Sequence, residues 1–494
     1  MLVALLTLLA AAPAVAPAAP AAPAAPAGGT AAGGGTAAGG GAAAAGGASP
    51  SPAPTAAAPG DTTDIVVDAL LPCGLRVLTA RDMTLPVASV VLAIETGSED
   101  DPPDAPGLVH ALAYQVLQGN RELRPGEVIA AAQDAGGLHG MATGFAQVRY
   151  ESLVPATRLD AVLWAESQRL RFPTTAPQRW EQTLGWAAGD ERTGSRLRPE
   201  ALAYVHGAPG LGHDGRAVGK SLAAMVEGVL AQQMSQKFNY TRATLVVVAP
   251  ESPERMLERI TPFFAGLPQQ RRTAPLRRLG PRPAAAASPA SSPASSPAPG
   301  APAMSPGTGA TVPLSRQRGH TFVWAVPPTP AANAWAAAIC RAINRQKKPP
   351  EAEEPRKARI GCDLESDPRR GVLIMRPSGT DDPWAMVRGR LARLAPGGPD
   401  AALLQAQAAT VTQALRLTQR TPQGLAQQLA MSPAEESTSP QPAFTRQHRV
   451  DDLTGVTALA DPASLQREAP DLLRVEAAVV LTYPETAEAP KAAP

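Results

Sequence analysis

The sequence predicts an α+β protein of two folded units, each with a mostly antiparallel sheet packed against helices. Short β-rich runs alternate with helical periodicity along most of the 494 residues. Two stretches dominated by Ala, Pro, Gly and Ser interrupt this pattern, at 17–60 and 271–313. The parts that follow these stretches share a similar order of elements, which favours two related domains.

Composition divides the chain into six segments, two of which are expected to fold. The low-complexity stretches bury too little apolar surface to offset the entropy of ordering them, so we interpret them as a tether and a linker. The segments are a signal peptide at 1–16, a tether at 17–60, a first domain at 61–270, a linker at 271–313, a second domain at 314–485 and a disordered tail at 486–494.

The amino-terminal segment has features of an export signal. The run from Leu2 to Ala12 is apolar but too short to span a membrane, and Ala12-Pro13-Ala14 has the form of a cleavage site. No Lys or Arg precedes the run, so an Ala-rich tail of a cytoplasmic protein is the alternative. We expect an exported protein of the periplasm or cell envelope, with no transmembrane domain.

In the first folded unit, strands and helices are expected in mixed order. Two β-rich runs, Ile65 to Leu70 and Leu75 to Ala80, flank the turn residues Pro72-Cys73-Gly74, which predicts a hairpin. Leu108, Leu112 and Val116 share one face of a helix, and Ser252 is a suitable cap for another. Further strands are predicted at 87–96, 148–154 and 244–249, and helices at 108–117, 127–135, 159–170 and 252–264.

The second unit starts near Arg316 and repeats this alternation. Strands are predicted at 321–326, 371–375 and 473–482, and helices at 333–344 and 381–395, with one long helical stretch at 400–429.

Charge and cysteine content exclude several classes of protein. The formal net charge is +2 with acidic and basic residues interleaved, and aromatic residues make up 4% of the chain, so we expect no nucleic acid partner. The three cysteines form no C-x-x-C motif, which argues against a zinc ribbon or a redox site. Cys340 and Cys362 are candidates for a disulfide in an exported protein, but whether they pair depends on a distance that the sequence does not contain.

A series of motifs in the first unit resembles the amino-terminal half of M16 (insulinase-like, inverted zinc motif) peptidases. Their order and spacing carry the resemblance more than any single motif does. The matching segments are Cys73-Gly74-Leu75-Arg76-Val77, Gly97 to Pro103, Gly107 to Tyr114, Gly136 to Thr143, Leu163 to Leu170, Gly189 to Arg192 and Arg242 to Ala249. The second unit resembles the carboxy-terminal M16 domain more faintly.

The resemblance implies a zinc site that this chain has lost. In the family, H-x-x-E-H places two histidine ligands one helical turn apart, a later glutamate completes the metal site, and the motif glutamate activates water. Here His110 and Glu191 remain as vestigial ligands, whereas Ala113 replaces the general base and Tyr114 replaces the second histidine. We therefore expect no catalytic residues and no bound zinc.

The family also implies a substrate strand, which corresponds here to Gly140, Met141, Ala142 and Thr143. In M16 peptidases this strand pairs with the peptide backbone. Gly140 stands where the family has asparagine, which removes a side-chain clamp but leaves backbone pairing. A rebuilt metal site made of His110, His139 and Glu191 is the one alternative arrangement of ligands.

Three functions follow. The leading hypothesis is a non-catalytic subunit that binds peptide or completes the chamber of an active M16 partner that carries zinc. The second is a stand-alone peptide- or protein-binding module of the envelope. The third is a residual zinc metalloendopeptidase with an atypical site.

Overall fold

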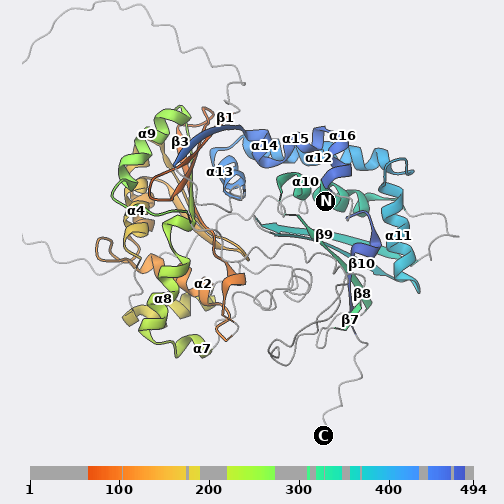
Figure 1. Cartoon of the computed structure of the whole chain (residues 1–494), viewed down its shortest axis with the longest axis horizontal. Coiled ribbons are helices and arrows are strands. Elements are labelled where there is room, and N and C mark those ends of the chain that lie inside the picture. Colours follow the sequence, from red (N-terminus) through yellow and green to blue (C-terminus); the bar gives the residue numbers. More distant parts are fainter. Residues whose placement is uncertain are drawn as a thin grey trace, which may run out of the picture.

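Two β-sheets organise the computed structural model of the protein (Figure 1). The structure describes residues 65–102, 104–173, 177–189, 220–272, 309–311, 319–327, 329–347, 357–367, 370–432, 443–468 and 472–483. The predicted signal peptide, tether and tail, almost all of the predicted linker, and Glu191 lie outside these ranges.

The first sheet has seven strands in the order β11-β1-β2-β6-β3-β5-β4. Every neighbouring pair is antiparallel except β2 with β6, which confirms the mostly antiparallel character that the sequence predicts. Gly74 adopts a φ of 88° in the predicted turn between β1 and β2. The strands are β1 (Ile65–Leu70), β2 (Arg76–Arg81), β3 (Val87–Ile94), β4 (Leu138–Thr143), β5 (Val148–Pro155), β6 (Ala243–Ala249) and β11 (Phe444–Arg449).

Helices cover one face of this sheet and enclose the first core (Figure 1). Alternate strand residues such as Val90, Leu92 and Val247 point into it and are fully or almost fully buried. Ser252 caps one of the helices, as predicted, by accepting a hydrogen bond from the Arg255 amide. The helices are α2 (Leu108–Gln115), α3 (Glu127–Asp134), α4 (Leu159–Arg171), α5 (Trp180–Gly189), α7 (Lys220–Ala223), α8 (Glu227–Lys237) and α9 (Pro253–Phe264).

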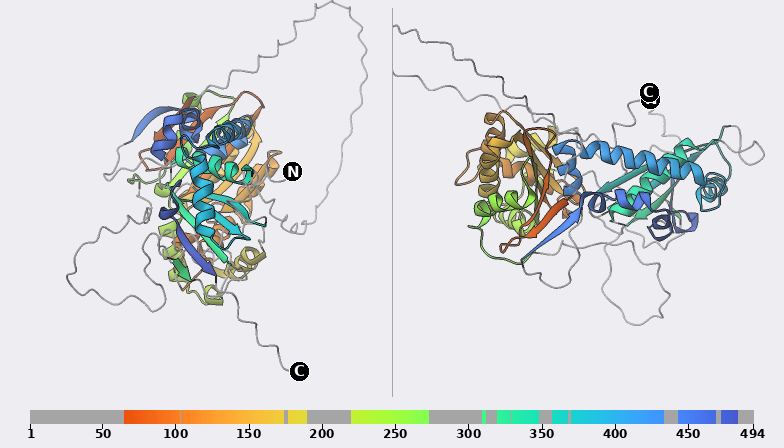
Figure 2. Two further views of the ribbon diagram at one scale, coloured as in Figure 1. Left: turned by 90° about the vertical axis from the view of Figure 1, so that its right-hand side faces the viewer. Right: turned by 90° about the horizontal axis from the view of Figure 1, so that it is seen from above.

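The second sheet has five strands in the order β7-β12-β8-β10-β9, and a second core lies between it and its helices. Its strands are β7 (Gly309–Thr311), β8 (Gly319–Val326), β9 (Arg359–Asp367), β10 (Arg370–Ser378) and β12 (Val479–Tyr483). The main helices of this half are α10 (Pro330–Arg345), α11 (Pro383–Leu394) and α12 (Ala401–Gln419), with the short helices α14 (Val450–Thr454), α15 (Val456–Ala460) and α16 (Pro462–Glu468). Figure 2 shows the two sheets in separate lobes.

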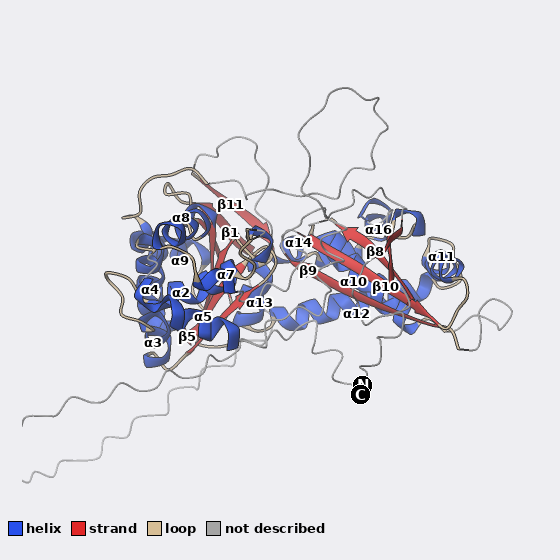
Figure 3. Cartoon of the chain, turned by 90° about the horizontal axis from the view of Figure 1, so that it is seen from below, coloured by secondary structure: helices blue, strands red, loops and turns tan. Residues whose placement is uncertain are grey.

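A segment of the second half crosses over to complete the first lobe. Strand β11 pairs with β1 along its whole length, and α13 (Pro422–Ala430) packs on the sheet face opposite the helices of the first core. Leu429 and Ala426 of α13 are fully buried there against Val91 and Val246. Figure 3 shows α12 reaching from the second lobe to α13. The lobes therefore share one apolar layer and one strand.

The predicted single helical stretch at 400–429 was wrong in one respect. Helix α12 ends at Gln419 and α13 begins anew at Pro422, with the Thr421 side chain accepting a hydrogen bond from the Gly424 amide. Proline lacks the amide donor that a continuous helix needs, but it fits the first turn of a new one. The predicted closing strand at 473–482 was also too long, because a 3₁₀ turn occupies 475–477 and β12 starts only at Val479.

Candidate functional site

Helix α2 carries the residues predicted to correspond to the zinc motif, His110, Ala113 and Tyr114, and the carboxylate of Asp101 binds its first turn. Asp101 is buried, and its two oxygens accept hydrogen bonds from the backbone amides of Gly107 at 2.8 Å and Val109 at 2.7 Å. Gly107 enters the helix at a φ of 82°, which a residue with a Cβ rarely adopts. Burial raises the pKa of Asp101 to about 7, against the opposing effect of the two amides.

His110 lies on the face of α2 that meets the edge strand β4. Its ring is buried, and Nδ1 lies 3.0 Å from the hydroxyl oxygen of Thr143. The half-buried ring of Tyr114, one turn later, meets the imidazole edge-on at a centroid distance of 5.3 Å. Both positions that hold zinc-ligand histidines in the family motif therefore pack against each other in this chain.

Ala113 occupies a closed position. Its side chain is fully buried in the first core, and its carbonyl accepts a hydrogen bond from the Tyr150 hydroxyl at 2.9 Å. A methyl group neither accepts nor delivers a proton. A general base needs room for a carboxylate and a water molecule, and the surroundings of Ala113 are filled by the packed core instead.

Strand β4 forms the outer edge of the first sheet and contains all four predicted substrate-binding residues, from Gly140 to Thr143. It pairs with β5 in a register that places Gly144 opposite Gln147, and the Gly144 amide donates to the Gln147 carbonyl at 2.8 Å. Hydrogen-bonded and non-hydrogen-bonded pairs alternate in an antiparallel ladder. The amide and carbonyl of Met141 consequently point away from β5, toward the edge on which no described strand pairs.

A buried polar cluster lies beneath this edge. Glu166 and Arg169, one turn apart on α4, form an ion pair that is almost wholly buried, and Arg169 lies over the Tyr150 ring at 3.7 Å. Burial raises the pKa of Glu166 and of Tyr150. The Leu-Trp-x-Glu-Ser-x-Arg-Leu motif contains both ionic residues at helical spacing, so the sequence itself carries a signal of this ion pair.

His139 belongs to this cluster and not to the surroundings of His110. Its Nδ1 lies 2.9 Å from the hydroxyl of Ser152, and burial, followed by the charge of Arg169, lowers its pKa to about 3. Thr143, the partner of His110, is four residues further along the strand, which corresponds to about 13 Å. The two imidazoles are thus held by separate hydroxyls.

The described residues do not fit a catalytic zinc ion. A catalytic zinc ion takes three protein ligands and a water molecule. The described part of the chain contains no group of three His, Cys, Asp or Glu residues arranged to hold a metal. Glu191, the predicted third position, lies outside the described ranges, so the candidate trio with His110 and His139 has only two described members.

Solved structures share this fold at low sequence identity. A protease from Helicobacter pylori aligns with a TM-score of 0.58 and 13% identity over 85% of this chain and 99% of that chain. The M16 inactive domain from Pseudomonas fluorescens gives 0.56 and 12% over 86% and 99%. The periplasmic protease PqqL from Escherichia coli gives 0.55 and 16% over 85% of this chain but 48% of its own.

The chain therefore has the M16 peptidase fold, as the sequence motifs predicted. It spans about half the length of PqqL and of pitrilysin, at 48% and 46% of those chains. No protein-family model matches the sequence, and no curated protein sequence matches it. Within the described residues, no helix is both long and apolar enough to cross a membrane.

Proposed function

We propose that this chain is a non-catalytic subunit that binds an extended peptide and completes the chamber of an active zinc metallopeptidase of the M16 type. One observation carries the proposal. The edge of β4 on which no described strand pairs lies beside α2, where His110 stands at the first histidine of the active motif and Ala113 and Tyr114 replace its glutamate and second histidine. The place that accepts a peptide strand is thus retained next to a helix without a general base.

Binding would use backbone hydrogen bonds. An extended peptide that adds to β4 meets the outward amide and carbonyl of Met141, as in other cases of strand addition. Gly140 and Ala142 present little side-chain bulk beside the added strand. This arrangement favours a broad range of peptides over one defined sequence.

The absence of bound zinc is part of the proposal. The Nδ1 atom of His110 already faces the Thr143 hydroxyl, and Tyr114 offers a phenol that is protonated at neutral pH. The extent of the structural matches adds support, because the aligned part covers 99% of the M16 inactive domain and 48% of PqqL. Two units of this size would together match the length of PqqL.

We also propose that the protein is exported to the periplasm or cell envelope. The Cys340–Cys362 disulfide supports this, since such bonds persist in oxidising compartments. The apolar run from Leu2 to Ala12 and the periplasmic location named for PqqL point the same way.

The test combines metal analysis with peptide hydrolysis. Zinc content and cleavage of an unstructured fluorophore–quencher peptide are measured for this chain alone, and then for its mixture with an M16 chain that carries H-x-x-E-H. We expect no zinc and no cleavage alone, and faster cleavage in the mixture. Stoichiometric zinc with chelator-sensitive cleavage by this chain alone would establish a residual metallopeptidase instead.

A variant pair tests the binding edge itself. Met141→Pro removes the outward amide, which makes no hydrogen bond to β5. Met141→Ala shortens the side chain and keeps that amide. We expect the proline variant to lose peptide binding and the alanine variant to keep it. Binding that persists equally in both variants refutes strand addition at β4. Peptide binding through β4 without any effect on a partner's activity would identify a stand-alone binding module.

A further inference from the structure

Strand β9 is the longest edge strand of the two sheets in the described structure. It pairs with β10 over nine residues, from Arg359 to Asp367, and no described strand lies on its other side. An edge of this length presents a row of outward amides and carbonyls, to which a foreign strand can add.

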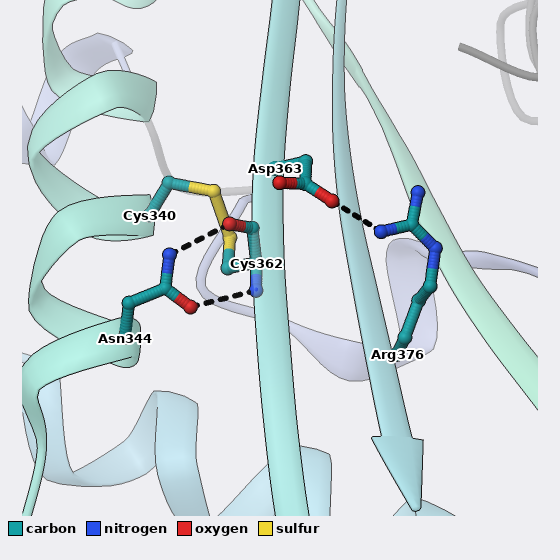
Figure 4. The surroundings of a disulfide bond; sticks show 5 residues. All are labelled: Cys340, Asn344, Cys362, Asp363 and Arg376. Atoms are coloured by element: carbon teal, nitrogen blue, oxygen red, sulfur yellow. Dashed lines mark hydrogen bonds and ion pairs between the residues drawn. A yellow bond between two sulfur atoms is a disulfide. The ribbon is translucent and has the colours of Figure 1, made fainter. Parts of the chain in front are cut away.

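A side chain closes this edge at its centre. The Cys362 amide donates to Oδ1 of Asn344 at 2.9 Å, and Nδ2 of Asn344 donates to the Cys362 carbonyl at 2.7 Å (Figure 4). These are the outward backbone groups at the centre of the row that an added strand would use. One carboxamide from α10 thus takes the place of a peptide unit of a neighbouring strand.

A covalent bond acts on the same strand residue. The Cys340–Cys362 disulfide joins α10 to β9, with a Cα–Cα distance of 5.1 Å. Cys340 precedes Asn344 by one helical turn, so both side chains leave the same face of α10 (Figure 4). The bond keeps that turn of the helix at the strand, which lowers the entropic cost of holding the Asn344 amide in place.

The sequence of β9 identifies the strand that would add if the edge were open. In antiparallel self-pairing centred on Cys362, position 359 of one copy faces position 365 of the other, and 360 faces 364. This sets Arg359 opposite Glu365 and Ile360 opposite Leu364. Opposite charges and apolar pairs in these positions stabilise strand pairing. The edge is therefore complementary to itself.

We propose that Cys340, Asn344 and Cys362 form an edge lock that prevents β9 from pairing with β9 of a second copy of the chain. The lock consists of the disulfide and the two Asn344 hydrogen bonds. It does not depend on peptide binding at β4, and its failure leaves the proposed function standing.

The test is sedimentation velocity over a range of protein concentrations. The full chain is compared with the variant Cys340→Ala/Cys362→Ala/Asn344→Ala, which removes both parts of the lock. We expect a concentration-dependent increase in sedimentation coefficient in the variant beyond that of the native chain. Identical sedimentation of the two proteins, with equal circular dichroism, overturns the proposal.

Charge reversal identifies the contact. In the unlocked variant, Glu365→Lys places like charges opposite each other twice in the dimer, and we expect about tenfold weaker association. Adding Arg359→Glu restores opposite charges and should restore association. If neither substitution changes the association constant, the contact does not involve β9 and the proposal is overturned.

A second measurement covers the case in which the unlocked variant fails to fold. In Asn344→Ala, with the disulfide retained, hydrogen exchange at the Cys362 amide should accelerate about tenfold or more, because its partner is gone. An unchanged exchange rate would show that Asn344 does not protect this edge.

Discussion

A glutamate at position 113, where the family motif has its general base, should destabilise the protein, because the position is fully buried. Ala113→Glu inserts a carboxylate into a site with no exposed side-chain surface. The added volume alone costs about 1–3 kcal/mol in a packed core. If burial keeps the new carboxyl protonated in the folded state, ionisation of the unfolded chain adds a penalty that grows with pH. From an unfolded pKa of about 4.3, this penalty is about 1 kcal/mol at pH 5 and about 4 kcal/mol at pH 7.5.

The control is Ala113→Gln, which has nearly the same volume and no titrating group. Urea unfolding of both variants at pH 5 and pH 7.5 separates volume from charge, since only the glutamate variant should lose stability as pH rises. The pKa of the new carboxyl is higher in the folded state than in the unfolded state, so protonation at low pH favours the folded protein. A glutamate variant that matches the glutamine variant at both pH values would show that the site admits water and a charge, and our description of a closed position would be wrong.

Two further predictions concern the groups that hold this region. Arg169→Met leaves Glu166 buried without its ion pair and should lower the free energy of unfolding by about 3–5 kcal/mol, most of which the double variant Glu166→Leu/Arg169→Met should recover. Arg416→Met, at an exposed ion pair, should lower it by under about 1 kcal/mol. Equal losses at both pairs would contradict this. The pKa of about 7 at Asp101 means that native stability falls by up to about 4 kcal/mol between pH 4 and pH 7, relative to Asp101→Asn. Urea unfolding profiles that run parallel for these two proteins would show that Asp101 does not titrate in this window.

Local patterns predicted most of the elements in the first half, because its central strands are continuous apolar runs buried on both faces and its helices bury one apolar stripe. The resemblance then placed His110 on α2 and Met141 on β4, and both positions agree with the structure. The contact between His110 and Thr143 was not predicted, since it depends on how α2 meets the edge of the sheet.

The second half was harder to predict because its signals are weaker or non-local. Strand β9 contains Arg359, Asp363 and Glu365 among apolar residues, so its charge masked its strand pattern. Strand β11 is almost entirely polar and exposed, and it exists as a strand because β1 is available to pair with it. The disulfide required a distance between α10 and β9 that only the fold supplies.

Because α13 and β11 cross to the first lobe, cleaving the backbone between the two halves of the chain would not separate them. A single break between Arg272 and Gly319 would sever the backbone connection but not the paired strands, and Gln427 of one fragment would still donate a hydrogen bond to Glu151 of the other at 2.6 Å. The amino-terminal piece made alone would expose the apolar face around Val91 and Val246 and would have a bare β1 edge. The two fragments are thus expected to reassemble when mixed, and neither fragment is expected to be soluble when made alone.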